Sequence, residues 1–180
     1  MLFVVTRRDR NEQGFSLLEM LLATVILLVG FIAIAQLVPA TILMNFRNRT
    51  DSSALVFAQR ELDQFLEQPL SSSSFTDATT GNTCALGNVA TPNVVQGSPL
   101  AVINSQVVID FTAAPVTNYS FPLPYQDPTD PSGTAYDVRW AVIVTGNGST
   151  ISSKRFILGV RQQGGNGYFQ PINLDTTRGK

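Results

Sequence analysis

The apolar segment from residue 15 to residue 44 constrains this chain more than any other feature. Its sequence, FSLLEMLLATVILLVGFIAIAQLVPATILM, runs for about 30 residues with a single charged side chain, Glu19. As a helix it would be roughly 45 Å long, and roughly 20 apolar residues are enough to cross a bilayer. The sequence therefore predicts a helix that crosses a membrane and continues beyond it.

Residues 1–14, MLFVVTRRDRNEQG, form a short leader before this segment, with Arg7, Arg8 and Arg10. Positive charge next to an apolar segment favours the cytoplasmic side of the membrane. We therefore expect a single-pass protein, with the leader in the cytoplasm and the C-terminal part outside it.

Glu19 is the unusual residue of the apolar segment. A carboxylate at the centre of a membrane helix is unfavourable by on the order of 2.5–3.5 kcal/mol. Glu19 lies roughly 13 Å beyond Arg10 if the segment is helical, and the apolar segment holds no cation. Glu19 is therefore either protonated or paired with a group from outside the chain. Cleavage between Gly14 and Phe15 would create such a group, an α-amino group on a neighbouring subunit. Breaking such a buried pair is unfavourable by roughly 3–5 kcal/mol.

The sequence GFSLLEMLLATVILLVG resembles the N-terminal methylation motif of type IV prepilins and type II secretion pseudopilins. The resemblance implies that a prepilin peptidase cuts after Gly14, that Phe15 is then N-methylated and that Glu19 guides subunit docking. It also implies other partners: further pilin or pseudopilin subunits, an inner-membrane platform protein, a motor ATPase that acts indirectly, and membrane lipid before assembly.

By this resemblance the chain is expected to be a structural subunit, a minor pilin of a type IV pilus or related filament. It would sit in the bacterial inner membrane and then in a pilus or pseudopilus at the cell envelope or surface. A minor pseudopilin of a type II secretion system is the alternative. A rival of another class is a membrane-anchored or secreted β-domain binding protein, because Ala33-Ile34-Ala35 resembles a signal-peptidase site that would release a chain beginning near Gln36.

The helix is predicted to continue beyond Met44 as an amphipathic segment, residues 45–69. Its apolar stripe recurs at three- and four-residue steps and comprises Leu55, Ala58, Leu62, Phe65 and Leu66. The other face is expected to be polar, with Arg60, Glu61, Asp63, Gln64 and Glu67. Pro69 ends the helix, and Gly30 and Pro39 are candidate positions for a bend. Pro39 falls a few residues later than the proline of many major pilins.

Residues 70–180 are predicted to form a β-rich head, so that the fold is α+β with an antiparallel sheet of about four strands. Strands are expected at 100–112, 136–146 and 153–163, and a hairpin with Asn147-Gly148 at its turn joins the last two. Residues 71–97 and 115–133 are expected to be long loops. The stripe of the second half of the helix is expected to cover one face of the sheet.

The composition disfavours catalysis, nucleic-acid binding and thiolate metal sites. The chain has no histidine, one cysteine (Cys84) and a net charge of −1, so it lacks the commonest general base and metal ligand. We expect no cofactor, no metal and no enzymatic activity. Asp127, Asp130 and Asp137 could offer oxygens to calcium, but their spacing fits no standard calcium loop. With no disulfide, the tail 162–180 is expected to be loose or held by packing alone.

Overall fold

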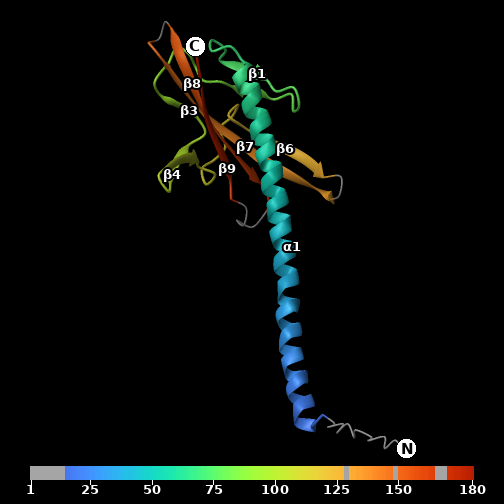
Figure 1. Cartoon of the computed structure of the whole chain (residues 1–180). Coiled ribbons are helices and arrows are strands. Elements are labelled where there is room, and N and C mark those ends of the chain that lie inside the picture. Colours follow the sequence, from blue (N-terminus) through green and yellow to red (C-terminus); the bar gives the residue numbers. More distant parts are fainter. Residues whose placement is uncertain (1–14, 128–129, 148–149, 165–169) are drawn as a thin grey trace, which may run out of the picture. The chain divides into compact units, whose positions relative to one another are not determined.

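The computed structural model describes residues 15–127, 130–147, 150–164 and 170–180 (Figure 1). One long helix, α1 (Leu17–Glu67), precedes a series of antiparallel strands, which confirms the predicted α+β fold. The strands are β1 (Ser74–Thr76), β2 (Thr83–Ala85), β3 (Val95–Gly97), β4 (Leu100–Ile103), β5 (Gln106–Ile109), β6 (Ser120–Asp127), β7 (Asp130–Gly146), β8 (Ile151–Gln162) and β9 (Ile172–Gly179).

The chain divides into two compact units, Met1–Asn45 and Phe46–Lys180. The first unit contains the apolar half of α1. The second unit contains the amphipathic half of α1 and the strands, and we call it the head.

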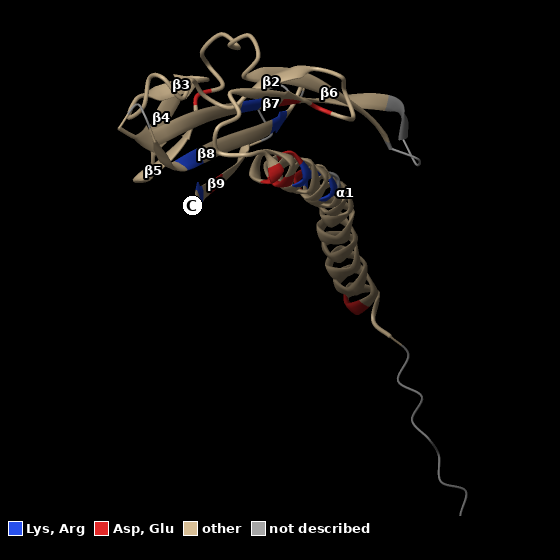
Figure 2. Cartoon of the chain, turned by 90° about the horizontal axis from the view of Figure 1, so that it is seen from above, with Lys and Arg blue, Asp and Glu red and all other residues tan. Residues whose placement is uncertain are grey.

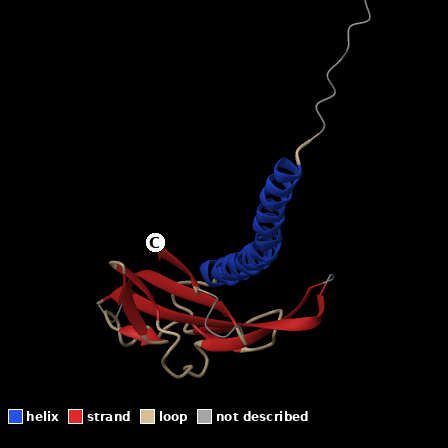
Figure 3. Cartoon of the chain, turned by 90° about the horizontal axis from the view of Figure 1, so that it is seen from below, coloured by secondary structure: helices blue, strands red, loops and turns tan. Residues whose placement is uncertain are grey.

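The central sheet of the head has five strands in the described residues, in the order β3-β7-β8-β9, with β6 also paired to β7. Figure 3 shows the strands in red and α1 in blue. β7 is long enough to take two partners on one side, because β6 pairs with its first half and β3 with residues 141–143. Two smaller sheets are formed by β1 with β2 and by β4 with β5.

The main core lies between α1 and the inner face of the central sheet. The predicted strand at 136–146 is confirmed as part of β7, and its alternating residues Val138, Trp140, Val142 and Val144 are all fully buried. They pack with Ala54, Ala58 and Phe65 of α1, and the Trp140 Nε1 donates a hydrogen bond of 2.8 Å to the carbonyl of Ala85. The expected cover of the sheet by the second half of the helix is therefore confirmed.

The expected polar face of α1 is wrong at one position. Glu61 is completely buried, while Leu55, assigned to the apolar stripe, is 37% exposed. The reason is the β1–β2 hairpin, which the sequence did not predict and which packs against the C-terminal part of α1. Phe75 of β1 meets Phe65 of α1 edge-on, with ring centroids 5.7 Å apart.

The single strand predicted at 100–112 is also wrong. The chain reverses at Asn104 and Ser105, which have φ values of 51° and 63°, so that β4 and β5 form a hairpin. A single strand would place Ile103, Val107, Ile109 and Phe111 on one face. Ile103 is 56% exposed and Val107 37% exposed, and only Ile109 and Phe111 are buried.

The β4–β5 hairpin leads into a second core on the outer face of the central sheet. This core contains Ile109, Phe111, Ala141 and Ile157. Gly159 permits the close approach, because a Cβ at that position would lie 2.8 Å from the Phe111 ring and 2.9 Å from the Ile109 Cβ.

Both predicted loops contain strands. Residues 71–97 include β1, β2 and β3, and residues 115–133 include β6 and the start of β7. The predicted β7–β8 hairpin is present, although Gly148 of its turn lies outside the described residues. The tail contains a strand too, since β9 pairs with β8 over eight positions from Val160↔Ile172 to Ser153↔Gly179.

Candidate functional site

The candidate site begins where α1 begins. Ser16 is the N-cap of the helix, because its Oγ accepts a hydrogen bond of 3.2 Å from the Glu19 backbone N–H. The Ser16 carbonyl accepts the first helical bond, 3.1 Å from the Met20 nitrogen. Phe15 precedes this cap and is 82% exposed. Gly14, the other half of the predicted cleavage site, lies outside the described residues.

Glu19 lies in the first turn of α1, where a carboxylate is favoured by the helix dipole. Ser16 and Glu19 have the S-x-x-E spacing of a capping box, a signal that the sequence analysis missed. The interaction of a carboxylate with the helix dipole stabilises an exposed helix end by about 0.3–1 kcal/mol. That is less than the roughly 2.5–3.5 kcal/mol of placing a carboxylate in lipid. Helix capping alone therefore does not account for Glu19 in an apolar segment.

The helix surface around Glu19 is apolar and open. The described residues from Phe15 to Asn45 are all exposed, and an 18-residue window of α1 has a mean hydropathy of 2.7. Figure 2 shows this as one red segment near the N-terminal end of α1, followed by a long uncharged stretch. By length and composition this helix can cross a membrane.

Polar side chains within the apolar half of α1 bond to its own backbone. Thr24 Oγ1 donates to the carbonyls of Met20 and Leu21, at 2.8 and 2.9 Å, and Thr41 Oγ1 donates to that of Leu37, at 2.8 Å. Such bonds satisfy hydroxyl groups in a medium without water. These threonines are compatible with lipid, in contrast to the Glu19 carboxylate.

Gly30 and Pro39 both lie inside the continuous helix. Pro39 has no N–H to donate to the carbonyl four residues earlier, and a Cβ at Gly30 would meet nothing within 4 Å. The bend that the sequence predicts at these two positions stays a prediction.

The other end of α1 is held by cations from distant strands. Arg178 of β9 donates from one guanidinium nitrogen to the carbonyls of Leu66 and Gln68. Lys154 of β8 donates to the carbonyl of Ser72, and burial lowers the pKa of this lysine to about 8. The Arg178 bonds satisfy carbonyls that the helix end leaves unpaired, whereas Ser72 lies beyond the end of α1 at Glu67. No sequence signal identifies them, because residues over 80 positions apart are joined.

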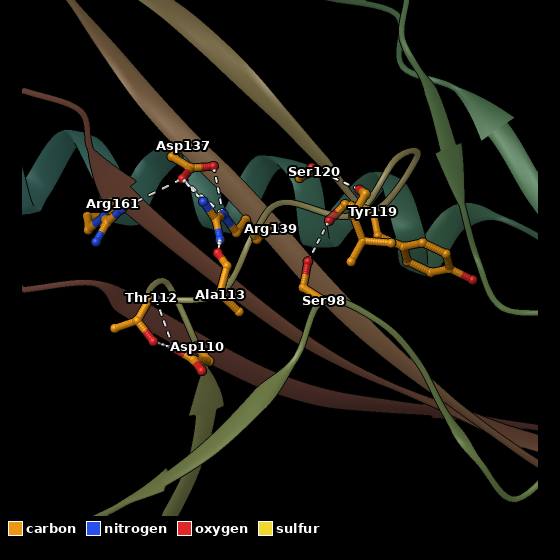
Figure 4. Close-up of polar contacts among 10 residues, drawn as sticks. Ser98, Asp110, Thr112, Ala113, Tyr119, Ser120, Asp137, Arg139 and Arg161 are labelled. Carbon is orange, nitrogen blue, oxygen red and sulfur yellow. Dashed lines mark hydrogen bonds and ion pairs between the residues drawn. The ribbon is translucent and has the colours of Figure 1, made fainter.

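A polar cluster on the outer face of the central sheet fixes the segment between β5 and β6 (Figure 4). Arg139 forms an ion pair of 2.8 Å with Asp137 and donates a hydrogen bond of 2.7 Å to the Ala113 carbonyl. Arg161 lies 3.9 Å from Asp137, and both guanidinium groups lie over the Phe111 ring.

This pairing places Asp137, the third aspartate of the considered calcium loop, in an ion pair. The side chains of Asp127 and Asp130 are not described. Among the described residues, no three acidic or cysteine side chains are grouped so as to hold a metal ion.

Residues 9–35 match the family model of the prokaryotic N-terminal methylation motif. This is the N-terminal segment of a type IV prepilin or pseudopilin. The match spans Gly14, Phe15 and Glu19, the residues that the sequence analysis selected. The chain is therefore a pilin-type structural subunit. The matched segment implies processing by prepilin peptidase and assembly with other pilin subunits. It also fits anchoring in the inner membrane before assembly.

The prepilin head lies outside the matched residues. No curated protein matches the chain, and no solved structure matches it. What the head does is therefore argued from its own structure.

Proposed function

We propose that the chain is a minor pilin, a low-abundance structural subunit of a type IV pilus or related filament. The observation that carries the proposal is the methylation motif on a helix whose described apolar side chains from Phe15 to Met44 are all exposed. The head, by contrast, has its own closed core. A helix with this surface needs lipid first and other apolar helices after assembly.

Processing prepares the helix for assembly in this proposal. The peptidase cuts between Gly14 and Phe15, and Phe15 is then methylated on the new amine. Phe15 precedes the N-cap Ser16, so the ammonium group would lie at the tip of α1, outside its first turn. The Glu19 carboxylate of one subunit then pairs with the ammonium of a neighbour that is displaced along the filament axis.

The pair selects the register of the incoming subunit. In an apolar helix bundle an unpaired charge is unfavourable by roughly 3–5 kcal/mol, so other registers are disfavoured. Each subunit uses different surfaces toward its two neighbours, the geometry that gives open filaments. A motor ATPase and a platform protein of the inner membrane supply the energy.

A minor pilin is favoured over a major one because many pilins close a C-terminal loop with a disulfide, which the single cysteine of this chain cannot form. Its tail is closed by strand β9 and the Arg178 contacts to the end of α1, without a disulfide. A minor pseudopilin of a type II secretion system has the same N-terminal chemistry and is the alternative. In purified filaments a minor pilin is a small fraction of the subunits, whereas a pseudopilin is absent from surface pili.

The assembly role is tested by Glu19→Ala, with Gln36→Ala as the matched control. Gln36 is also an exposed polar residue of the apolar half of α1. Both variants are expected to insert into the membrane and to be processed. Glu19→Ala leaves the ammonium of a neighbour unpaired, which corresponds to roughly a hundredfold or greater loss of association. The measurement is the filament-bound fraction of each variant. Normal incorporation of Glu19→Ala would contradict the proposal.

A further inference from the structure

Two buried carboxyl groups meet where the β1–β2 hairpin packs on α1. Glu61 of α1 and Asp77, the residue after β1, have no exposed surface. In each carboxyl group one oxygen, Glu61 Oε2 and Asp77 Oδ1, is buried without a hydrogen-bond partner among the described residues. Buried polar atoms are nearly always paired, so these two oxygens call for an explanation.

The other oxygen of each carboxyl group is occupied. Glu61 Oε1 accepts a hydrogen bond of 2.5 Å from Arg60 Nη2. Asp77 Oδ2 accepts two bonds from Thr80, 2.6 Å from its backbone nitrogen and 2.5 Å from its hydroxyl. Each carboxyl group is thus fixed through one oxygen, and the second oxygen is left for another interaction.

The two carboxyl groups lie within electrostatic range of each other. Asp77 raises the pKa of Glu61, and both residues act on the neutral thiol of Cys84 in β2. Gln64, which follows Glu61 by about one turn of α1, is close enough to Asp77 to lower the pKa of that carboxyl group. The charged groups that act on Glu61 are Arg60 on α1 and Asp77 on the hairpin.

The surroundings shift the pKa values of the two carboxyl groups in opposite directions. Burial raises the pKa of Glu61, and Arg60 opposes this only in part. Burial also acts to raise the pKa of Asp77, but hydrogen bonding, above all from Thr80, outweighs it and leaves that pKa below its usual value. Two acids pushed apart in this way favour one protonated and one ionised group.

We propose that Glu61 and Asp77 share one proton, with Glu61 Oε2–H donating to Asp77 Oδ1, and that this bond locks the β1–β2 hairpin onto α1. The hairpin takes up one proton from solvent when it docks, and the pair keeps one negative charge next to Arg60. The bond satisfies both unpaired oxygens at once.

The lock has a defined pH range. Glu61 has a raised pKa in the folded head, so its contribution is complete at acidic pH and is lost as the pH rises through that value. Asp77 has a lowered pKa, so its contribution is lost as the pH falls through its own value. Docking is therefore tightest between the two. Between the ordinary pKa of a free glutamate and the raised pKa of Glu61, opening of the hairpin increases by up to about tenfold for each pH unit, as expected for one proton, and above the raised pKa it levels off.

Hydrogen exchange on the full chain in detergent micelles tests the lock. The reporters are the amides of Asp77, Gly81 and Leu86, which bond to the carbonyls of Asn82, Asp77 and Ser73. After correction for intrinsic exchange, the wild-type chain is expected to show this rise in opening with pH up to the raised pKa of Glu61, and Glu61→Gln no such rise. Glu67→Gln, an exposed position of the same helix, should behave as the wild type. Equal pH slopes in wild type and Glu61→Gln would overturn the proposal.

Infrared spectroscopy tests the proton itself. Because Glu19 can also be protonated in the apolar helix, all chains compared carry Glu19→Gln. Below the raised pKa of Glu61, this chain and its Glu67→Gln variant should show the band of a protonated carboxylic acid at pH values where an ordinary glutamate is ionised, and its Glu61→Gln variant should lack that band. Asp77→Asn removes the negative neighbour, so the band should titrate at lower pH in that variant. A Glu19→Gln chain without the band, or its Glu61→Gln variant with the band, would overturn the proposal.

Discussion

At the scale of single residues, Arg178 shows how a distant side chain completes a helix. The last turn of α1 contains no basic residue, so its carbonyls have no nearby cation. Arg178 supplies one from β9, with bonds to the carbonyls of Leu66 and Gln68. The final strand of the chain thereby holds the end of the helix that carries the assembly segment.

Replacing Arg178 by alanine is expected to destabilise the head by about 1.5–3 kcal/mol, the range for a hydrogen bond with a charged donor. Arg178→Lys should recover part of this loss, because it keeps the charge but not the fork of donors. The measurement is the unfolding midpoint in denaturant of the full chain in micelles. Lys180→Ala, exposed at the end of the chain, is the control. Equal midpoints for Arg178→Ala and Lys180→Ala would contradict this assignment.

At the scale of elements, the helix and the β7–β8 hairpin could be predicted because their signals are local. The apolar segment, the three- and four-residue steps after it and the alternation from Val138 to Val144 all lie within short stretches. The β4–β5 hairpin could not be predicted, because its apolar residues continue the same alternation on both sides of Asn104 and Ser105. Strand β9 contains polar residues such as Asp175 and Arg178 and shows no apolar alternation. It could not be predicted, because its pairing with β8 is a tertiary effect.

The residues of the candidate site and of the head likewise differ in whether a local sequence signal identifies them. Gly14, Phe15 and Glu19 could be selected from the sequence because the motif is continuous. The burial of Glu61 could not, because the β1–β2 hairpin that covers it is made of three-residue strands and the helix periodicity places Glu61 beside polar neighbours. A short strand gives too few residues for an alternation to be recognised.

The β4–β5 turn offers a test at this scale. Ser105 has a φ of 63°, a left-handed conformation that is unfavourable by roughly 1–2 kcal/mol for most L-residues. Ser105→Gly creates an Asn-Gly turn, which favours this hairpin geometry, and should stabilise the head by up to about 1 kcal/mol. Ser152→Gly in β8, without a left-handed φ, should destabilise it. The same denaturation measurement decides, and a loss of stability in Ser105→Gly would contradict the assigned turn.

At the scale of the whole molecule, the two units place opposite demands on their surroundings. The head buries its own core, with Trp140, Phe65 and Phe156 at its centre. The first unit leaves an apolar helix surface exposed, with Glu19 as its one charge between Phe15 and Met44. A self-sufficient head joined to a helix that requires apolar partners is the combination that a filament subunit needs.

The mass of the N-terminal peptide from the mature protein tests the central claim most directly. The proposed processing predicts a polypeptide that begins at Phe15, with a methyl group on its amine, because only cleavage after Gly14 creates the cation that Glu19 requires. A mature chain that keeps residues before Phe15, or one that begins near Gln36, would contradict the account.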